Sequence, residues 1–266
     1  MDGQLLRHKM WKSFYNSQVG WAHLKQIPPL PCQDYSFASN EPIPYLIVCD
    51  GAGSAPLSHI GSERMVKIIA ESIELLQSII KEILDEELPN DTEERKKEQL
   101  KQIFINASLK ELEKLSLEYK VPKSFFRTTL MIFIIGKNKC FWLKIGDGAI
   151  LIQKTNNELE LIGPIQKGEF INETVFISEK IKDEDVACNL IKNDIKAVIS
   201  FTDGAGEKLI SNDGKNFAGL IKKWFDQIRE NKFENEELVN FLSSQEVWSK
   251  TTGDDKSIAM LVSELS

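Results

Sequence analysis

The chain has 266 residues, of which 42% are hydrophobic and 27% are charged, and this composition excludes a fibrous or largely disordered protein. It has 33 basic and 40 acidic residues and a net charge of −7, so we expect no broad attraction to nucleic acid or to an anionic membrane. No run approaches the roughly 20 apolar residues that a spanning helix needs, and the polar N-terminal segment has no apolar signal-peptide region. We therefore expect a cytoplasmic protein with no membrane or nucleic-acid partner.

Four cysteines are spread along the chain without a CxxC pair: Cys32, Cys49, Cys140 and Cys188. Cys49 and Cys140 lie inside apolar, strand-like runs. We interpret all four as reduced packing residues, which is typical of a cytosolic protein. A zinc site and a redox thiol are the alternatives, but the three widely spaced histidines do not favour zinc.

Two long helices are predicted in the first half of the chain. Apolar residues repeat at helical spacing from near Ser62 to Leu84, and a Pro-Asn-Asp break follows at 89–91. A second amphipathic pattern runs from Leu100 to Tyr119, and Pro122 ends it.

Short apolar or alternating runs predict strands on both sides of these helices. The predicted strands are Tyr45–Cys49, Thr128–Ile135, Lys139–Ile145, Ala149–Gln153, Glu158–Ile162, Thr174–Ser178, Ala197–Phe201 and Ser257–Val262. Two further helices are predicted at about 215–230 and 234–245. This order of elements indicates a mixed domain whose helices pack outside its sheets.

One pattern recurs at the ends of the predicted strands. An aspartate next to a glycine follows an apolar run at Asp50-Gly51, Asp147-Gly148 and Asp203-Gly204. Asp254 directly precedes the last strand, and Asp34 lies near the start of the sheet region. A strand end is a rigid base, and glycine permits a tight turn and a close approach to a ligand.

Several carboxylates that converge would repel one another unless cations neutralised them. Ligation by oxygen alone favours hard cations such as Mg²⁺ or Mn²⁺. Two such ions about 3.5–4 Å apart activate a bridging water and bind phosphoryl oxygens. The alternative is that each Asp-Gly pair forms an independent turn, and the residues alone leave both interpretations open.

These segments resemble, in order and spacing, the motifs of the metal-dependent protein phosphatases of type 2C. The matching residues are Asp34, Asp50-Gly51, Gly146-Asp147, Thr202-Asp203-Gly204 and Gly253-Asp254-Asp255. PCQDYS resembles the family's first aspartate motif, and FFRTTL resembles the strand that opens the centre of the domain. DGAGSAPLSHIGS resembles the second aspartate motif in a form typical of a bacterial branch, and GEFINETVFIS is similar to the same branch. The resemblance extends from about Gly20 to Val262.

The resemblance implies an α+β fold, a four-layer α-β-β-α sandwich of two antiparallel sheets flanked by helices. We expect a single phosphatase-like domain over residues 1–266, with a catalytic core at about 20–263. A flap is expected at about 155–175.

The resemblance also implies two bound ions, Mn²⁺ or Mg²⁺, and their ligands. Asp50 would bridge the ions, and Gly51 would offer its backbone carbonyl to one of them. Asp203 and Asp254 would complete the other site.

The resemblance implies less direct roles for three further carboxylates. Asp34 would act at the site directly or through water. Asp147 matches a position that, with Asp203, holds a third and weaker cation. Asp255 is expected to support the site or to form a turn.

The sequence departs from the family pattern at two positions. Where many members have a phosphate-gripping arginine, this chain offers His23, with Lys25 as a second candidate; the alternative for His23 is a polar residue at a strand edge. Where some members have a general-acid histidine, Ala52 is found instead. We expect His59 to lie at the start of the following helix.

The predicted function is hydrolysis of phosphoserine or phosphothreonine in proteins by a water activated by two Mn²⁺ or Mg²⁺ ions, with Asp50, His23 and Lys25 as catalytic candidates. The expected partners are phosphorylated proteins and a cognate Ser/Thr kinase or its targets. One alternative is a weakly active or inactive family member that binds a phosphoprotein or kinase as a regulator. Another is a phosphatase of small metabolites.

Overall fold

The computed structural model describes residues 10–164, 174–211 and 213–264. The strands within these residues are β1 (Trp11–Gln18), β2 (Tyr35–Ser39), β3 (Tyr45–Cys49), β4 (Leu130–Ile135), β5 (Lys139–Ile145), β6 (Ala149–Lys154), β7 (Leu159–Ile162), β8 (Ala187–Lys192), β9 (Ile195–Phe201) and β10 (Lys256–Ser263). They form two five-stranded sheets, in the orders β1-β10-β9-β6-β7 and β2-β3-β4-β5-β8. Every pairing between these strands is antiparallel.

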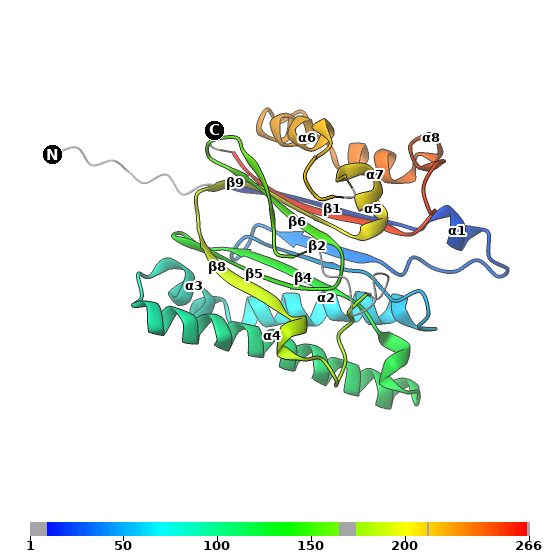
Figure 1. The fold of residues 1–266 in the computed structure, drawn as a ribbon, viewed down its shortest axis with the longest axis horizontal. Helices are drawn as coiled ribbons and strands as arrows, with labels where there is room; N and C mark the ends of the chain where they lie inside the picture. Colours follow the sequence, from blue (N-terminus) through cyan, green and yellow to red (C-terminus); the bar gives the residue numbers. More distant parts are fainter. Residues whose placement is uncertain (1–9, 165–173, 212, 265–266) are drawn as a thin grey trace.

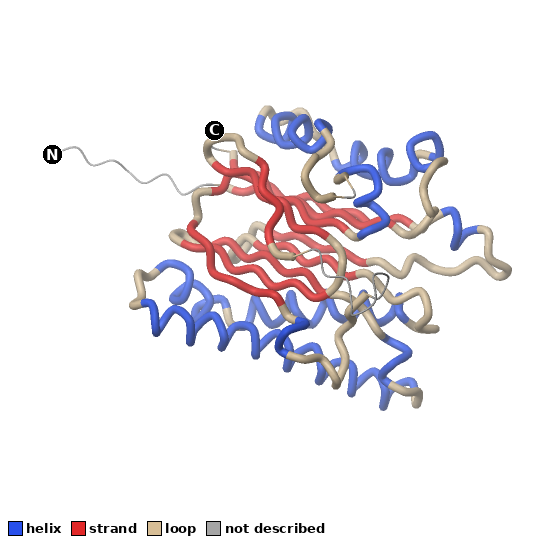
Figure 2. Tube along the Cα trace, viewed as in Figure 1, coloured by secondary structure: helices blue, strands red, loops and turns tan. Residues whose placement is uncertain are grey.

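Helices cover the outer face of each sheet, as Figures 1 and 2 show. The α-helices of the described residues are α1 (Trp21–Leu24), α2 (Ser58–Leu75), α3 (Gln77–Asp85), α4 (Asn90–Tyr119), α5 (Asp203–Leu209), α6 (Gly219–Arg229), α7 (Asn235–Ser243) and α8 (Gln245–Trp248). The 3₁₀ helices are η1 (Lys123–Phe126) and η2 (Asp183–Asp185). Helices α2, α3 and α4 lie on one side of the sandwich, and α5 to α8 lie on the other. The expected four-layer α-β-β-α fold is confirmed.

Strand β3 shows why its sequence is continuously apolar. Leu46 and Val48 join the core between the two sheets, whereas Tyr45, Ile47 and Cys49 join the core between the sheet and helices α2 to α4. Because side chains alternate along a strand, a strand covered on both faces needs apolar residues at every position. A third apolar core lies between the other sheet and helices α5 to α8. None of the helices in the described ranges is both long and apolar enough to cross a membrane.

Two of the predicted elements are wrong in detail. The predicted strand Thr174–Ser178 is irregular and joins no ladder; Ile177 N–H donates to the Thr128 carbonyl at 2.9 Å. The predicted helix from Ser62 to Leu84 is two helices, because the chain turns at Leu76. The turn lets α3 pack on β5 while Leu75 stays 83% exposed.

The topology gathers three strand ends at one end of the sandwich. Gly51, just after β3, forms a β-bridge with Thr128, just before β4. The connection from β5 to β6 crosses from one sheet to the other, and the first residue of β6, Ala149, pairs with the last residue of β9, Phe201. The residues that follow β3, β5 and β9 therefore lie close together, although they are far apart in the sequence.

Candidate metal centre

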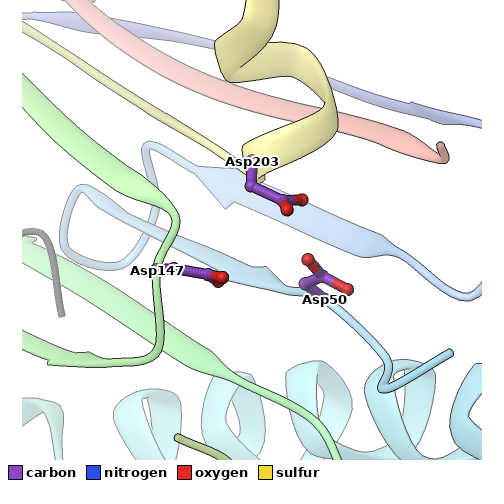
Figure 3. A group of neighbouring side chains, drawn as sticks. All are labelled: Asp50, Asp147 and Asp203. Atoms are coloured by element: carbon purple, nitrogen blue, oxygen red, sulfur yellow. The ribbon is translucent and has the colours of Figure 1, made fainter. Parts of the chain in front are cut away.

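Asp50, Asp147 and Asp203 occupy these three strand ends. Each offers a carboxylate oxygen, and the three oxygens lie within 4.8 Å of one another. Figure 3 shows Asp50 at the end of β3, Asp147 in the connection between the sheets and Asp203 at the first turn of α5, with their carboxylates directed toward a shared space. The structure thus brings together three of the six residues predicted as metal ligands.

The backbone of Asp50 is fixed by two threonines. Asp50 N–H donates to Thr129 Oγ1 at 2.8 Å, and the Asp50 carbonyl accepts from Thr128 Oγ1 at 2.9 Å and from Thr129 N–H at 2.8 Å. Both threonines are buried. They hold the main chain and leave the Asp50 side chain free to project from the strand end. The sequence pattern predicts only that both threonines lie in a strand (128–135), and it does not indicate this contact.

Gly51 is in a place that admits no side chain. A Cβ atom at this position would lie 2.6 Å from the Gln33 carbonyl oxygen and 2.9 Å from Ser58 Cβ. Its N–H donates to that same Gln33 carbonyl at 3.1 Å. Glycine therefore allows the chain to pass close to residue 33 directly after the predicted bridging aspartate.

Asp34 lies next to the cluster and is 4% exposed. Its carboxylate accepts a hydrogen bond from Thr202 Oγ1 at 2.7 Å, and that hydroxyl accepts from Ser257 N–H at 3.0 Å. Burial raises the pKa of Asp34 well above its usual value, and the charge of Asp203 adds to the effect. Asp34 is thus tied to the residue that precedes Asp203.

The cluster is rich in negative charge, and the charges that act most strongly on Asp50 and Asp203 are those of other carboxylates. Burial, followed by repulsion from Asp34 and Asp203, raises the pKa of Asp50 well above its usual value. Burial, followed by the charge of Asp147, raises the pKa of Asp203 to about 6. Neither shift is opposed by a nearby lysine or arginine among its principal causes. The carboxylates therefore favour either protons or external cations.

Asp147 supplies the test of whether a cation fits. Its Oδ2 accepts a hydrogen bond from Thr174 Oγ1 at 2.6 Å, whereas its Oδ1 is buried and has no hydrogen-bond partner among the described residues. An unpaired buried carboxylate oxygen is costly, and a metal ion would satisfy it. The donor set consists of carboxylate oxygens, which suit Mg²⁺ or Mn²⁺. The residues present therefore fit hard divalent cations.

Asp254 is at the rim of this group rather than inside it. Its Cβ lies 3.3 Å from the position a Cβ would take on Gly204, the residue after Asp203. Burial raises the pKa of Asp254, and its own charge contributes to the raised pKa values of Asp50 and Asp203. Its role as a ligand of the second ion stays a prediction.

The two candidate phosphate-binding cations have partners of their own. His23, on α1 rather than on a strand edge, has Nδ1 2.9 Å from Asp255 Oδ2. The Asp255 carboxylate also accepts from Gly20 N–H at 2.6 Å and Gln33 N–H at 2.5 Å, so it ties three segments together. The Lys25 ammonium lies 4.2 Å from the centroid of the Trp21 ring. Their role in phosphate binding stays a prediction.

The two other histidine-related expectations concern the loop and helix after Asp50. His59 lies in the first turn of α2, as predicted, and burial lowers its pKa. Ala52 is buried beside Gly51 and carries no proton donor. Part of the predicted flap at about 155–175 falls on residues 165–173, which lie outside the described residues, and Leu159–Ile162 form β7.

Comparison with known proteins gives a family. The family model described as Protein phosphatase 2C matches residues 19–243. The chain belongs to this family. A sequence comparison with curated proteins gave no match.

Solved structures with the protein phosphatase 2C fold resemble the chain over nearly its full length. The catalytic domain of the serine/threonine phosphatase PstP, solved with two manganese ions, is 13% identical, with coverage of 95% of this chain and 98% of that one and a TM-score of 0.63. PppA of Pseudomonas aeruginosa is 12% identical, with coverage of 95% and 97% and a TM-score of 0.60. Stp1 of Staphylococcus aureus is 12% identical, with 95% of each chain covered and a TM-score of 0.56. At these identities the likeness shows the fold.

Proposed function

We propose that this protein is a metal-dependent phosphatase that hydrolyses phosphoserine and phosphothreonine in proteins. The observation that carries the proposal is the convergence of Asp50, Asp147 and Asp203 within 4.8 Å at the strand ends of a protein phosphatase 2C chain. The raised pKa values of Asp50 and Asp203 support the same conclusion, because they mark a place where positive charge is needed.

Two divalent ions, Mn²⁺ or Mg²⁺, would be held by Asp50, the Gly51 carbonyl, Asp203 and Asp254, and Asp147 would hold a third, weaker ion with Asp203. Asp34 would contribute directly or through water. The structure of PstP, which contains two manganese ions, supports a site for two ions in this fold. When bound, the ions would supply a nucleophilic water at neutral pH and neutralise phosphoryl charge.

The chain's own residues position this chemistry. Thr128 and Thr129 fix the main chain of Asp50, and Thr174 orients Asp147. Because Ala52 carries no donor and burial keeps His59 neutral near pH 7, we propose that water protonates the leaving alkoxide. A single phosphatase domain acting in the cytoplasm on the targets of a Ser/Thr kinase completes the proposal.

The direct test is turnover of a phosphothreonine peptide with and without Mn²⁺. We expect release of phosphate that requires Mn²⁺, stops on chelation and exceeds the release from a panel of phosphorylated metabolites. Turnover of metabolites alone would overturn the assignment of protein substrates. Turnover that survives complete chelation would overturn the metal-dependent mechanism.

A second candidate function is a weakly active or inactive member that binds a phosphoprotein or kinase as a regulator. The observation that favours it is the engagement of His23 by Asp255 and of Lys25 by the Trp21 ring, which leaves neither directed at a phosphate. Phosphopeptide binding in the presence of Mn²⁺ without any turnover is the result that would select this candidate.

A further inference from the structure

A groove with a volume of about 550 Å³ begins beside the acidic cluster. Its walls are η1 with Arg127 on one side and the segment 174–182 on the other, and α4 contributes Leu112. Thr174 lines the groove and also donates its hydrogen bond to Asp147. The groove therefore opens next to the position proposed for phosphate hydrolysis and leads away from it.

The groove is lined by several basic side chains, although the protein has a net charge of −7. Lys123, Arg127, Lys180 and Lys182 line it together with Glu179, Glu184 and Asp185, so the four basic and three acidic side chains give its lining a net charge of +1. Lys123 is paired with Glu179, and Lys182 lies 3.2 Å from Glu184. Within the described residues, Arg127 has no carboxylate at ion-pair distance, so its charge remains uncompensated at the groove wall.

The guanidinium of Arg127 has hydrogen-bonding capacity left over. One of its donors, Nη2, reaches Ser54 Oγ at 3.3 Å, and its central carbon lies 6.0 Å from the Phe176 ring centroid. Its Nε is buried and has no acceptor within the described residues. A buried donor without a partner is destabilising, and a carboxylate is the acceptor that a guanidinium binds best, with two parallel hydrogen bonds.

The backbone of Arg127 is held rigidly near the cluster. Its carbonyl accepts from Ala52 N–H at 3.0 Å, and Phe126, which precedes it, is fully buried in the core. Thr128, which follows, forms the β-bridge with Gly51. Arg127 therefore directly precedes the Thr128–Gly51 bridge, and Gly51 directly follows Asp50. An extended peptide advances about 3.3–3.6 Å per residue, so a substrate residue two or three positions from the phosphorylated one lies about 7–11 Å from it.

We propose that the groove binds the substrate polypeptide next to the phosphorylated residue, and that Arg127 selects substrates with an aspartate or glutamate within about three residues of it. This inference rests on the proposed function, since it names the substrate class of the same site. The acidic side chain of the substrate accepts hydrogen bonds from the remaining Nη donors of Arg127, which lines the groove. Lys180, which is exposed farther along the groove, favours additional acidic residues.

The test compares phosphothreonine peptides that differ only in flanking residues, which are glutamate, glutamine or lysine. Turnover with Mn²⁺ is measured for each peptide, and binding of the matching non-hydrolysable phosphonate peptides is measured by fluorescence anisotropy. The variants are Arg127→Gln and Arg127→Glu, and Arg95→Gln is the matched control. Arg95 is exposed on α4 and bonds only to the Asp91 carbonyl and Thr92.

We expect the unmodified protein to bind the glutamate peptide about tenfold more tightly than the glutamine peptide. Arg127→Gln removes that preference, Arg127→Glu reverses it toward the lysine peptide, and Arg95→Gln keeps it. Equal binding of all three peptides by the unmodified protein, or a preference that survives in Arg127→Glu, overturns the inference. Absence of turnover with every peptide counts against the proposed hydrolysis, and the phosphonate binding then still decides the role of Arg127. A reversed preference also excludes simple misfolding of the variant.

Discussion

Two groups of carboxylates in this protein are treated in opposite ways. Glu111 on α4 is 4% exposed, and Arg64 of α2 lies 2.5 Å from it, with Lys114 at 3.8 Å. Asp50 and Asp203, at the strand ends, face other carboxylates instead, and burial and repulsion raise their pKa values. Glu111 has a countercharge at ion-pair distance, whereas no lysine or arginine of the described residues lies at ion-pair distance from Asp50 or Asp203.

This difference in countercharge suggests a structural role for Glu111 and a functional role for the strand-end aspartates. A paired carboxylate such as Glu111 links two helices, and removal of one partner of such a pair is destabilising because the other charge is left unpaired. Carboxylates held close together without cations repel one another and destabilise the metal-free protein. Such unfavourable arrangements are typical of functional sites. Each prediction below tests whether the two groups differ in this way.

The largest effect is expected from loss of one charge in the strand-end group. Asp50→Asn and Asp203→Asn should each lower Mn²⁺-dependent turnover at least about a hundredfold, since loss of even an outer-shell partner of a metal site costs up to that much. Without metal, both variants should be at least as stable as the unmodified protein, because a repelling charge is gone. Steady-state kinetics and chemical denaturation provide the two readouts.

Glu111→Gln is the matched control for that prediction. It should keep the metal-dependent turnover and lose about 1–3 kcal/mol of stability, because Arg64 loses its closest partner. The contrast between the two groups would be wrong if Asp50→Asn kept turnover. It would also be wrong if Glu111→Gln lost turnover in the same way as Asp50→Asn.

The next effect concerns pH. In the metal-free protein the folded state holds protons more tightly than the unfolded state, since the pKa of Asp203 rises from 3.8 to about 6. The contribution of this group to stability is therefore greatest at low pH and is lost as pH rises from about 4 through about 6. Mn²⁺ binds the deprotonated carboxylates, so it should stabilise the protein more at pH 7.5 than at pH 5.

Thermal unfolding with and without Mn²⁺ at the two pH values measures this dependence. A saturating ion at a hundred times its dissociation constant should add about 2.7 kcal/mol at the higher pH. Equal stabilisation at both values would show that the raised pKa of Asp203 has no part in ion binding.

The smallest effect is expected from the residues that hold the cluster in place. Thr129→Val removes the hydroxyl that accepts from Asp50 N–H and keeps the shape of the side chain. Turnover should fall about tenfold, with the metal-concentration dependence shifted to higher Mn²⁺. Val66→Ala, in the core under α2, serves as a control that alters packing without touching Asp50. An unchanged metal dependence in Thr129→Val would indicate that the threonine serves packing only.

The sequence predicted the parts of the fold whose physical signal is local. Strands buried on both faces, such as β3 and β5, have continuous apolar runs and were predicted with their observed bounds. Strands β1, β2 and β8 were missed because they lie at the ends of the sheets or are only partly buried, so their residues mix polar and apolar types. The division between α2 and α3 has no proline or glycine to mark it.

For the candidate site, the sequence pointed to the aspartates but not to what surrounds them. Asp50, Asp147 and Asp203 follow strand ends, and that pattern is visible in one dimension. The hydrogen bonds of Thr128, Thr129 and Thr202 depend on which strand ends meet, and no local pattern contains that information. The pairing of His23 with Asp255 likewise joins residues from opposite ends of the chain.

The central claim is that the strand-end aspartates form a site for divalent cations. Calorimetric titration of the metal-free protein with Mn²⁺ at pH 7.5 tests it most directly. We predict saturable binding of two ions, with a third of lower affinity that Asp147→Ala removes, and proton release that confirms displacement from carboxylates. Absence of saturable binding in the folded protein, or binding that Asp50→Asn and Asp203→Asn leave unaltered, would contradict the account.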